Sequence, residues 1–505
     1  MKFTTARCCR SLGMRCAYLA CALVIVTCWN SRSTAEPQFS VPAGQRQLFL
    51  DDHGVHKLTN LTRTMHQPRK RGAVIRAPRE NQTLQIRTAP AWDPELDRYR
   101  IWLHGLDRNI WESRDGVNWT VGPEPKPSIV MAVYDPNDDD PQCRYKAAHL
   151  NSGFSVSADG VKWTRLAVPA IQSFDEGNFS YDPQHGLFIH TVKRRGPHGR
   201  SVAIATSRDF RTWKDYGVVF HADTRDQELG RQRIEARRTN PALKQTEYHT
   251  PEHYSVQIYN MGVFHYEGLY IGLPSMYHHT GKVPPDWPGF DKMHLSPYIL
   301  GLVRKHGDYT GFYTIELAYS RDLVNWQRLG SREPFIEASP LGAGAYDTQT
   351  LIGPSEPVVR DDELWFYYTG IQQYAFIGSG NDPAYDDYVP DAGAICLAVL
   401  RRDGFMSLDA GDDGGEVITK PFVLSGGDLS VNVAIGKNGR LDTTVLDDTG
   451  SVVAGAEPLT RGQRRGTLNW QSGSLTALRD KTVSLRFTLR NASLYSYWVG
   501  PARSE

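Results

Sequence analysis

Acidic side chains stand at or just before several predicted β-strands, where they could work as paired carboxyl groups. They are Glu80, Asp175, Glu176, Glu252 and Asp347, with Glu356 further along the last of these strands. Two carboxyl groups in different surroundings can differ in pKa, so that one donates a proton while the other stays ionised. The chemistry they could perform is general acid–base catalysis, provided that the fold brings distant stretches of chain together.

Basic and aromatic side chains accompany these acids. Arg87 and Tyr259 fall on strands predicted to line the inside of the fold, and Lys193 and Arg200 flank a glycine-containing turn. The two cations could hold a hydroxyl-rich or anionic ring, although a solvated hairpin tip would also explain them. Glu252 lies on an insertion that could lean over a pocket. We expect Arg87, Lys193, Arg200, Glu252 and Tyr259 to bind substrate.

No residue pattern in the chain predicts a metal site or a cofactor. His278 and His279 are adjacent on a predicted strand, so their side chains point to opposite faces. The acid-rich stretch Asp135–Asp140 lacks the glycine and distal glutamate of a calcium loop. Cys143 and Cys396 show no zinc-type Cys/His spacing. We therefore expect neither a metal nor a cofactor.

A repeated turn motif indicates which elements position these side chains. Four segments share Ser, Asp and Trp at the same spacing, and a fifth copy is degenerate. They are Ser113–Trp119, Ser157–Trp163, Ser207–Trp213, Ser320–Trp326 and Arg402–Phe405. In each copy the Asp side chain can close a turn, and Gly can supply a positive φ where it is present. The Trp can then pack the turn onto the next strand.

The spacing of these repeats predicts an all-β fold built on a five-bladed β-propeller at 36–412. The motif aspartates stand at 115, 159, 209, 322 and 403, and the first intervals suit four-stranded blades of about 40–50 residues. The long interval holds one blade that begins near Gln257, plus an insertion at about 223–255. The innermost strand of each blade would line a central pocket. Asp51 and Asp52 would mark the N-terminal strand that closes the ring.

Residues 413–505 show a different pattern. Leu429, Val431, Val433 and Ile435 alternate with polar residues, as in a strand with one buried face. This segment predicts a compact antiparallel β-sandwich. We expect it to cover a flank of the propeller, with glycan binding as the alternative.

The first 35 residues have the features of a secretory signal. Basic residues precede an apolar run from Ala17 to Trp29, and the small residues Ser33-Thr34-Ala35 follow. The apolar run is too short for a membrane-spanning helix, which needs about 20 residues. We expect a secreted or periplasmic protein; a lipid anchor at Cys21 or Cys28 is the less favoured alternative.

Charge and cysteine content exclude several classes of protein. The chain has 57 basic and 56 acidic residues, and five basic residues leave with the signal, so 52 against 56 gives the mature chain a net charge near −4. No basic face for nucleic acid is predicted. Two cysteines remain after the signal, so no disulfide framework is predicted. We expect a carbohydrate as the partner, and the oligomeric state stays open.

With the repeats in view, the chain resembles the five-bladed glycoside hydrolases of families 32 and 43. It is most similar to exported bacterial proteins described as family-32-like, over about Leu48 to Val499. The signs are Phe49–Asp52 with His66–Pro68, Asn178–Pro183, Asp362–Gly370 and Asn491–Tyr497. The resemblance implies hydrolysis of glycosidic bonds by paired carboxyl groups in an axial pocket. It also implies that Glu80, Asp175 and Asp347 are catalytic, because they match acidic positions of the family-32-like group.

The chain also departs from family 32. The Trp-Met-Asn-Asp-Pro-Asn-Gly, Arg-Asp-Pro and Glu-Cys stretches of that family are missing, which argues against hydrolysis of β-fructosides. We expect an exo-acting glycosidase for a plant, algal or other polysaccharide-derived oligosaccharide. The first alternative is a non-catalytic glycan-binding propeller. A sialidase-like hydrolase, suggested by the turn motif, and a phosphorylase that uses Lys193, Arg194 and Arg200 come after it.

Overall fold

The computed structural model describes residues 39–77, 84–106, 108–246, 248–292, 297–342, 344–372 and 393–501. The predicted signal segment and the predicted catalytic Glu80 lie outside the described residues. Phe39–Glu505 form one compact unit. In the described part of this unit, no helix has the length and apolar character needed to span a membrane.

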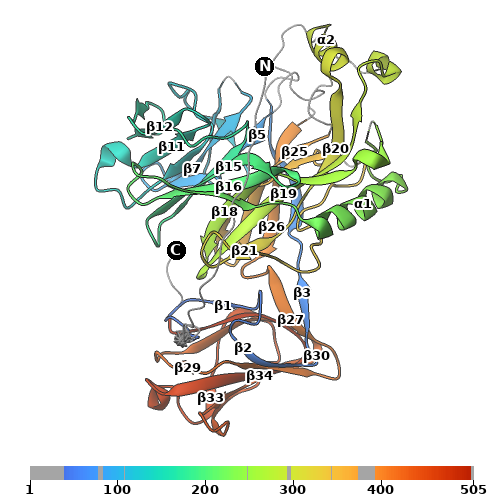
Figure 1. Ribbon diagram of the computed structural model, residues 1–505. Coiled ribbons are helices and arrows are strands. Elements are labelled where there is room, and N and C mark those ends of the chain that lie inside the picture. The colour runs from blue at the N-terminus through green and yellow to red at the C-terminus, as the bar shows by residue number, and fades with distance from the viewer. Residues whose placement is uncertain are drawn as a thin grey trace, which may run out of the picture. The chain divides into compact units, whose positions relative to one another are not determined.

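Five antiparallel sheets form the blades of a β-propeller, as the repeats predict (Figure 1). Blade 1 contains β5 (Gln85–Ile86), β6 (Ala91–Asp93), β7 (Arg98–His104), β8 (Ile110–Ser113) and β9 (Thr120–Val121). Blade 2 contains β10 (Ala132–Tyr134), β11 (Tyr145–His149), β12 (Gly153–Ser157) and β13 (Thr164–Arg165). Blade 3 contains β14 (Gly177–Asp182), β15 (Leu187–Gly196), β16 (Gly199–Ser207) and β17 (Lys214–Phe220).

The last two blades are larger. Blade 4 contains β18 (Ser255–Tyr266), β19 (Leu269–Val283), β20 (Asp308–Ile315), β21 (Ala318–Ser320) and β22 (Trp326–Arg328). Blade 5 contains β23 (Thr350–Ile352), β24 (Val358–Arg360), β25 (Glu363–Ile371), β26 (Gly393–Arg401) and β4 (Arg69–Arg76). The innermost strands are β5, β10, β14, β18 and β23.

An N-terminal strand closes the ring, but a later one than predicted. Strand β4 pairs antiparallel with β26 as the outermost strand of blade 5. Asp51 and Asp52, expected to mark the closing strand, lie instead in the connection between β1 (Gln47–Leu48) and β2 (Val55–Thr59). Asp51 forms an ion pair with Arg321 there, with 2.7 Å between Oδ2 and Nη1. The acidic pair is therefore part of a turn and does not close the propeller.

The repeated motif forms the turn that its residues predict. Asp115 Oδ1 accepts the backbone N–H groups of Val117 and Asn118 at 2.8 and 2.7 Å. Trp119 Nε1 donates to the carbonyl of Gly116, which has a φ of +75°. In the copies without glycine, Phe210 and Leu323 adopt the same positive φ, at +57° and +67°. The turn geometry is thus kept even where a bulky residue must take the strained conformation.

The described residues also form a few helices. The α-helices are α1 (Thr224–Arg238) and α2 (Pro297–His306), and the short 3-10 helices are η1 (Pro141–Cys143), η2 (Pro251–His253), η3 (Pro288–Lys292) and η5 (Thr476–Leu478). Helix α1 lies in the predicted insertion and begins with a capping box formed by Asp223 and Asp226. The buried Asp226 carboxylate binds Arg328 of β22 at 2.6 Å, so the helix is fixed to blade 4.

The C-terminal strands form a separate sheet-rich region, consistent with the predicted sandwich. Its strands are β27 (Met406–Ala410), β28 (Gly415–Thr419), β29 (Phe422–Val423), β30 (Leu429–Leu446), β31 (Val452–Ala456), β32 (Gln463–Thr467), β33 (Trp470–Ser472) and β34 (Thr482–Val499). Alternating residues such as Leu429, Val431 and Phe487 are fully buried in one core.

N-terminal strands also belong to this region. Strand β1 pairs with β34, β2 pairs with β28, and β3 (Thr62–Met65) pairs with β27. The sequence predicts a propeller that spans 36–412. In the structure, the strands at 47–65 and 406–410 pair instead with the C-terminal strands. The reason is that strand pairing depends on contacts across the whole chain, which no local pattern records.

The degenerate fifth repeat has become the junction between the two regions. Asp403 has a φ of +61° and is 1% exposed. Its carboxylate binds Arg46 at 2.7 Å and accepts hydrogen bonds from Tyr266 of β18 and Ser496 of β34 at 2.7 and 2.5 Å. One buried carboxylate therefore connects blade 4, the N-terminal segment and the C-terminal sheet.

Candidate active site

Glu176 lies on the propeller axis, where it joins blades 1 and 3. Arg87 Nε lies 2.6 Å from Glu176 Oε2, and Arg87 Nη2 lies 2.8 Å from Oε1. Arg87 directly follows the inner strand β5, and Glu176 directly precedes the inner strand β14. Blade 2 separates these blades in the ring, so the contact between them crosses the central channel. Both side chains are buried, and the pair marks the centre of the propeller.

Two further residues, Tyr259 and Lys193, surround this pair. We refer to Arg87, Asp175, Glu176, Lys193 and Tyr259 together as the axial cluster. The hydroxyl of Tyr259, on the inner strand β18, donates to Glu176 Oε1 at 2.8 Å. Burial and the Glu176 carboxylate raise the pKa of this hydroxyl. Lys193 of β15 places Nζ 3.7 Å from the centre of the Tyr259 ring. Burial lowers the pKa of Lys193, while the carboxylates of Glu176 and Asp175 oppose that shift.

Asp175 is the exposed carboxyl group of the cluster. Its side chain is 69% exposed, and its Oδ1 lies 2.9 Å from Lys193 Nζ. Glu176, by contrast, uses both oxygens on Arg87 and Tyr259. Asp175 can therefore meet a ligand in solvent, whereas Glu176 is a fixed negative charge beneath it.

The loop that carries both acids is tied to β15. The Ser173 hydroxyl donates to the Glu176 carbonyl at 2.6 Å, and the Lys193 N–H donates to the same carbonyl at 3.1 Å. Gly177 follows, and a Cβ there would meet the Thr191 carbonyl oxygen at 2.9 Å. Glycine is needed at this position because the inner strand runs so close to its neighbour. The backbone thus fixes where the two carboxyl groups point.

Aromatic rings extend the cluster along blade 4. Tyr259 and Tyr313 contact edge to face at 5.1 Å between ring centres, and Tyr313 stacks on Tyr277 at 5.0 Å. The Arg200 guanidinium lies 5.3 Å from the Tyr277 ring centre and donates to Gln257 Oε1 at 2.8 Å. Aromatic faces next to charged groups suit the apolar and hydroxyl-bearing sides of a sugar ring.

Four of the predicted site residues thus lie together in the cluster that contains Glu176. They are Arg87, Asp175, Lys193 and Tyr259, and Arg200 lies on the adjoining aromatic wall. Lys193 is 2% exposed, so it is not at a solvated hairpin tip. Their roles in binding and catalysis stay predictions.

Asp347 lies in a separate cluster on blade 5. Its Oδ2 accepts a hydrogen bond from the Tyr368 hydroxyl of β25 at 2.8 Å and pairs with Lys70 of β4 at 2.7 Å. Asp347 is 4% exposed, and burial together with Asp347 raises the pKa of the adjacent Cys396 thiol. Its partners belong to the second and the outermost strands of one blade, whereas Glu176 is held by residues of other blades.

Two other acids occupy different places. Glu252 is an exposed residue of η2, at the start of blade 4. Glu356 is half-buried beyond β23, in a cavity of about 360 Å³ that Trp92, Tyr134 and Tyr181 also line. Burial and the Asp182 charge raise the pKa of Glu356 to about 8. Neither Glu252 nor Glu356 is a member of the axial cluster.

The sequence points to Asp175 rather than to its neighbour Glu176, and it does not predict His104. His104 ends β7 opposite Gln85 of β5, and burial together with the Arg87 charge lowers its pKa. The pattern gave no signal for His104, because its proximity to Arg87 depends on pairing between strands.

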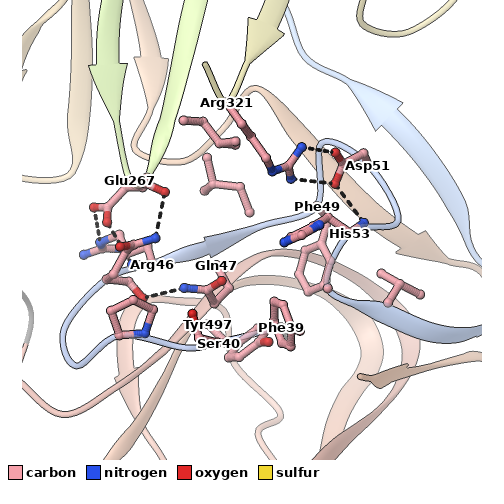
Figure 2. Close-up of a pocket in the computed structure, with 17 residues that line it drawn as sticks. Phe39, Ser40, Arg46, Gln47, Phe49, Asp51, His53, Glu267, Arg321 and Tyr497 are labelled. Carbon is pink, nitrogen blue, oxygen red and sulfur yellow. Dashed lines mark hydrogen bonds and ion pairs between the residues drawn. The ribbon is translucent and has the colours of Figure 1, made fainter. Parts of the chain in front are cut away.

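A further cavity, of about 220 Å³, lies beside the junction of the propeller with the C-terminal sheet (Figure 2). Its walls include Phe39, Arg46, Asp51, Glu267 and Arg321. Figure 2 shows that the charged groups face one another in pairs, Arg321 toward Asp51 and Arg46 toward Glu267. The residues that line this cavity include no member of the axial cluster.

Comparisons with known proteins were made at the levels of sequence and structure. No protein-family profile and no curated protein sequence matches the chain. A family-32 β-fructofuranosidase structure from Bombyx mori has 10% identity, 86% of this chain and 95% of that chain covered, and a TM-score of 0.35. A thermostable family-43 glycoside hydrolase has 12% identity, coverages of 66% and 96%, and a TM-score of 0.34. An N-acetylgalactosamine deacetylase from F. plautii has 14% identity, coverages of 68% and 97%, and a TM-score of 0.33.

These matches assign neither a substrate nor a catalytic residue to this chain. The chain is a five-bladed β-propeller with a C-terminal sheet-rich region that is consistent with a β-sandwich.

Proposed function

We propose that the chain is a glycoside hydrolase whose active site is the axial cluster around Glu176. The observation that carries the proposal is the meeting of Arg87, Asp175, Glu176 and Tyr259 from three blades at one point of the axis. Glycoside hydrolysis requires an ionised carboxylate and a proton-donating carboxyl group beside a bound sugar. The cluster offers carboxylates, positive charge and aromatic surface together.

Within this proposal, Asp175 is the carboxylate that meets the substrate. It is exposed, and its Oδ1 lies 2.9 Å from Lys193 Nζ. Arg87 and Tyr259 hold Glu176 as a fixed charge that keeps Lys193 in place. The candidates for the proton donor are Glu80 and Asp347, which the sequence predicts to be catalytic. Replacement of each in turn tests which of them donates the proton.

The geometry of the axis supports action at a chain end. Just beyond the cluster, Asn178 Nδ2 donates to the Arg87 carbonyl at 3.3 Å, and Asn260 Nδ2 donates to Asn178 Oδ1 at 2.9 Å. These bonds join blades 1, 3 and 4 just beyond the cluster. They support our proposal of an exo-acting enzyme on an oligosaccharide, and the signal-like first 35 residues support the proposal of export.

A non-catalytic glycan-binding protein is the second candidate. The observation that favours it is that Glu176 and Asp347 are both engaged by a cation and a tyrosine, which leaves them poorly placed for proton transfer. Such a protein would bind sugars through the same aromatic wall and leave them intact.

One experiment separates the candidates. The purified full chain is incubated with a panel of aryl glycosides and plant or algal oligosaccharides, with and without inorganic phosphate, and products are separated by chromatography. Binding of the same oligosaccharides is measured by calorimetry. Hydrolysis without phosphate supports the proposal, phosphate-dependent release of a sugar phosphate supports a phosphorylase, and binding without products supports the glycan-binding protein.

A further inference from the structure

A second cluster of side chains lies at the other end of the inner strands. Asp182 ends β14, His185 is in the turn that follows, and His265 is near the end of β18. Glu176 directly precedes the same β14, so about 20 Å of extended strand separates the two ends at about 3.3 Å per residue. The cluster is therefore distinct from the axial site. The sequence does not indicate this cluster, because its residues come from two blades.

The side-chain atoms of this cluster lie at distances that a metal ion could bridge. His185 Nδ1 is 2.6 Å from Asp182 Oδ2, and His265 Nδ1 is 3.7 Å from Asp182 Oδ1. One ligand atom from each residue falls within 4.8 Å of the others. A metal with bonds of about 2.0–2.2 Å places neighbouring tetrahedral ligands roughly 3.4 Å apart. The 3.7 Å contact is already near that spacing, and the 2.6 Å contact would have to lengthen to reach it.

Burial makes the cluster a built site. The side chains of Asp182 and His265 are 2% and 8% exposed, while that of His185 is 44% exposed. The ion-pair partners of Asp182 among the described residues are the two histidines, and neither is a permanent cation as Lys or Arg would be. A carboxylate buried in this way is stabilised by a bound cation.

Space for further ligands adjoins the cluster. A cavity of about 190 Å³ is lined by His185, His265, Gln45, Tyr270 and Arg321, among others. The Arg321 guanidinium pairs with Asp51 through two bonds of 2.7 and 3.2 Å and points toward it in Figure 2. Its charge is thus compensated by Asp51. The cavity leaves room for water on the open side of an ion held by the three residues.

We propose that Asp182, His185 and His265 bind one divalent transition-metal ion of the zinc class. Two imidazoles and one carboxylate suit such ions, whereas calcium and magnesium prefer oxygen ligands throughout. The three residues fix one face of the ion, and water from the cavity completes its coordination. The ion would join blades 3 and 4 at this end of the propeller.

The test uses the untagged full chain after treatment with EDTA and dialysis into metal-free buffer. Calorimetric titration with zinc chloride is expected to give one ion per chain, and magnesium chloride is expected to give no comparable heat. Cobalt(II) reports the site directly, because ligation by the histidines produces visible absorption bands. Zinc is also expected to raise the midpoint of thermal unfolding as its concentration rises.

Two variants assign the site, and a third is the control. His185→Gln removes an exposed ligand without disturbing the core. Asp182→Asn removes the charge but keeps an oxygen for the N–H groups of Gln184 and His185, which the carboxylate accepts at 3.1 and 3.2 Å. Each variant should weaken zinc affinity by about tenfold or more. His306→Gln, in an exposed position of α2, should leave it unchanged.

Two results would overturn the proposal. One is the absence of stoichiometric binding of zinc and cobalt to the folded wild-type chain. The other is equal zinc affinity and equal cobalt spectra in the wild type, His185→Gln and Asp182→Asn. In either case the three residues form a hydrogen-bonded Asp–His cluster and nothing more. Neither result bears on glycoside hydrolysis, which is proposed for the axial cluster.

Discussion

Arg87 and Glu176 form an ion pair across the propeller axis, with a hydrogen bond of 2.8 Å to Oε1 and a contact of 2.6 Å to Oε2. The pair connects blades that are not neighbours in the ring, and it positions the carboxylate on which Tyr259 also converges. Its two oxygens and the guanidinium are matched in shape and charge, which is the geometry that makes arginine–carboxylate pairs strong. The axial cluster depends on this pair for its geometry.

Removal of one partner should therefore be costly. Arg87→Met leaves Glu176 buried without its cation and should lower the free energy of unfolding by about 3–5 kcal/mol. The double variant Arg87→Met with Glu176→Gln should recover part of that loss, since no unpaired charge remains. Urea denaturation measures both, and Arg195→Met, at an exposed position of the same protein, is the control. Equal losses in the single and double variants would contradict a cost of the unpaired Glu176 charge.

Asp403 should make the propeller and the C-terminal region unfold together. Burial acts to raise its pKa, but the Arg46 charge and the hydrogen bonds of Ser496, Tyr266 and Asn432 outweigh burial and lower it. At pH 7, Asp403→Ala should cost about 3–5 kcal/mol of unfolding free energy and split the calorimetric transition in two. Because the folded pKa is below the unfolded one, the wild-type advantage is present above about pH 4 and is lost at lower pH.

Asp413→Ala is the matched control for that experiment. Asp413 is an exposed acid in the connection between β27 and β28, and its replacement should change unfolding by less than about 0.5 kcal/mol. A single transition of unchanged midpoint in Asp403→Ala would contradict the role of the junction.

Because of Glu356, the free energy of unfolding should fall as the pH rises. Burial, and then the Asp182 charge, raise its folded pKa to about 8, above an unfolded value of about 4.3. The folded state therefore holds a proton that the unfolded state has lost, so stability falls between about pH 4.3 and 8 and is level above that. Glu356→Gln should match the wild type near pH 4 and exceed it by about 1–3 kcal/mol at pH 8.

Thermal unfolding in EDTA-containing buffer at several pH values checks this. Glu337→Gln, at an exposed position, should follow the wild type throughout. A stability difference between Glu356→Gln and the wild type that stays constant from pH 4 to pH 9 would show that the carboxyl group titrates normally.

The propeller could be predicted from the sequence because its signal is local and repeated. The turn of Asp115 and Trp119 closes within seven residues, and its copies recur once per blade. The pairing of Leu48 with Ser496 could not be predicted, since neither strand carries information about a partner more than four hundred positions away.

One loop of the candidate site, at residues 175–176, could be located from the sequence to within one residue. A loop before an inner strand could be placed, and Asp175 and Glu176 were both recognised there. Which of the two faces the axis depends on strand register, and a slip of one residue exchanges the two faces. The structure places Glu176 on the axis and leaves Asp175 exposed. His185 and His265 were missed for a related reason, because contact between blades leaves no periodicity in the chain.

The most direct test of the axial site compares kcat/KM of the wild type and Asp175→Asn on the best substrate from the glycoside panel. Asp175 is exposed, so the variant should fold with an unchanged thermal midpoint. We predict that kcat/KM falls by about a hundredfold or more, as expected for loss of a catalytic carboxyl group. An Asp175→Asn variant as active as the wild type would contradict the assignment of hydrolysis to this end of the axis.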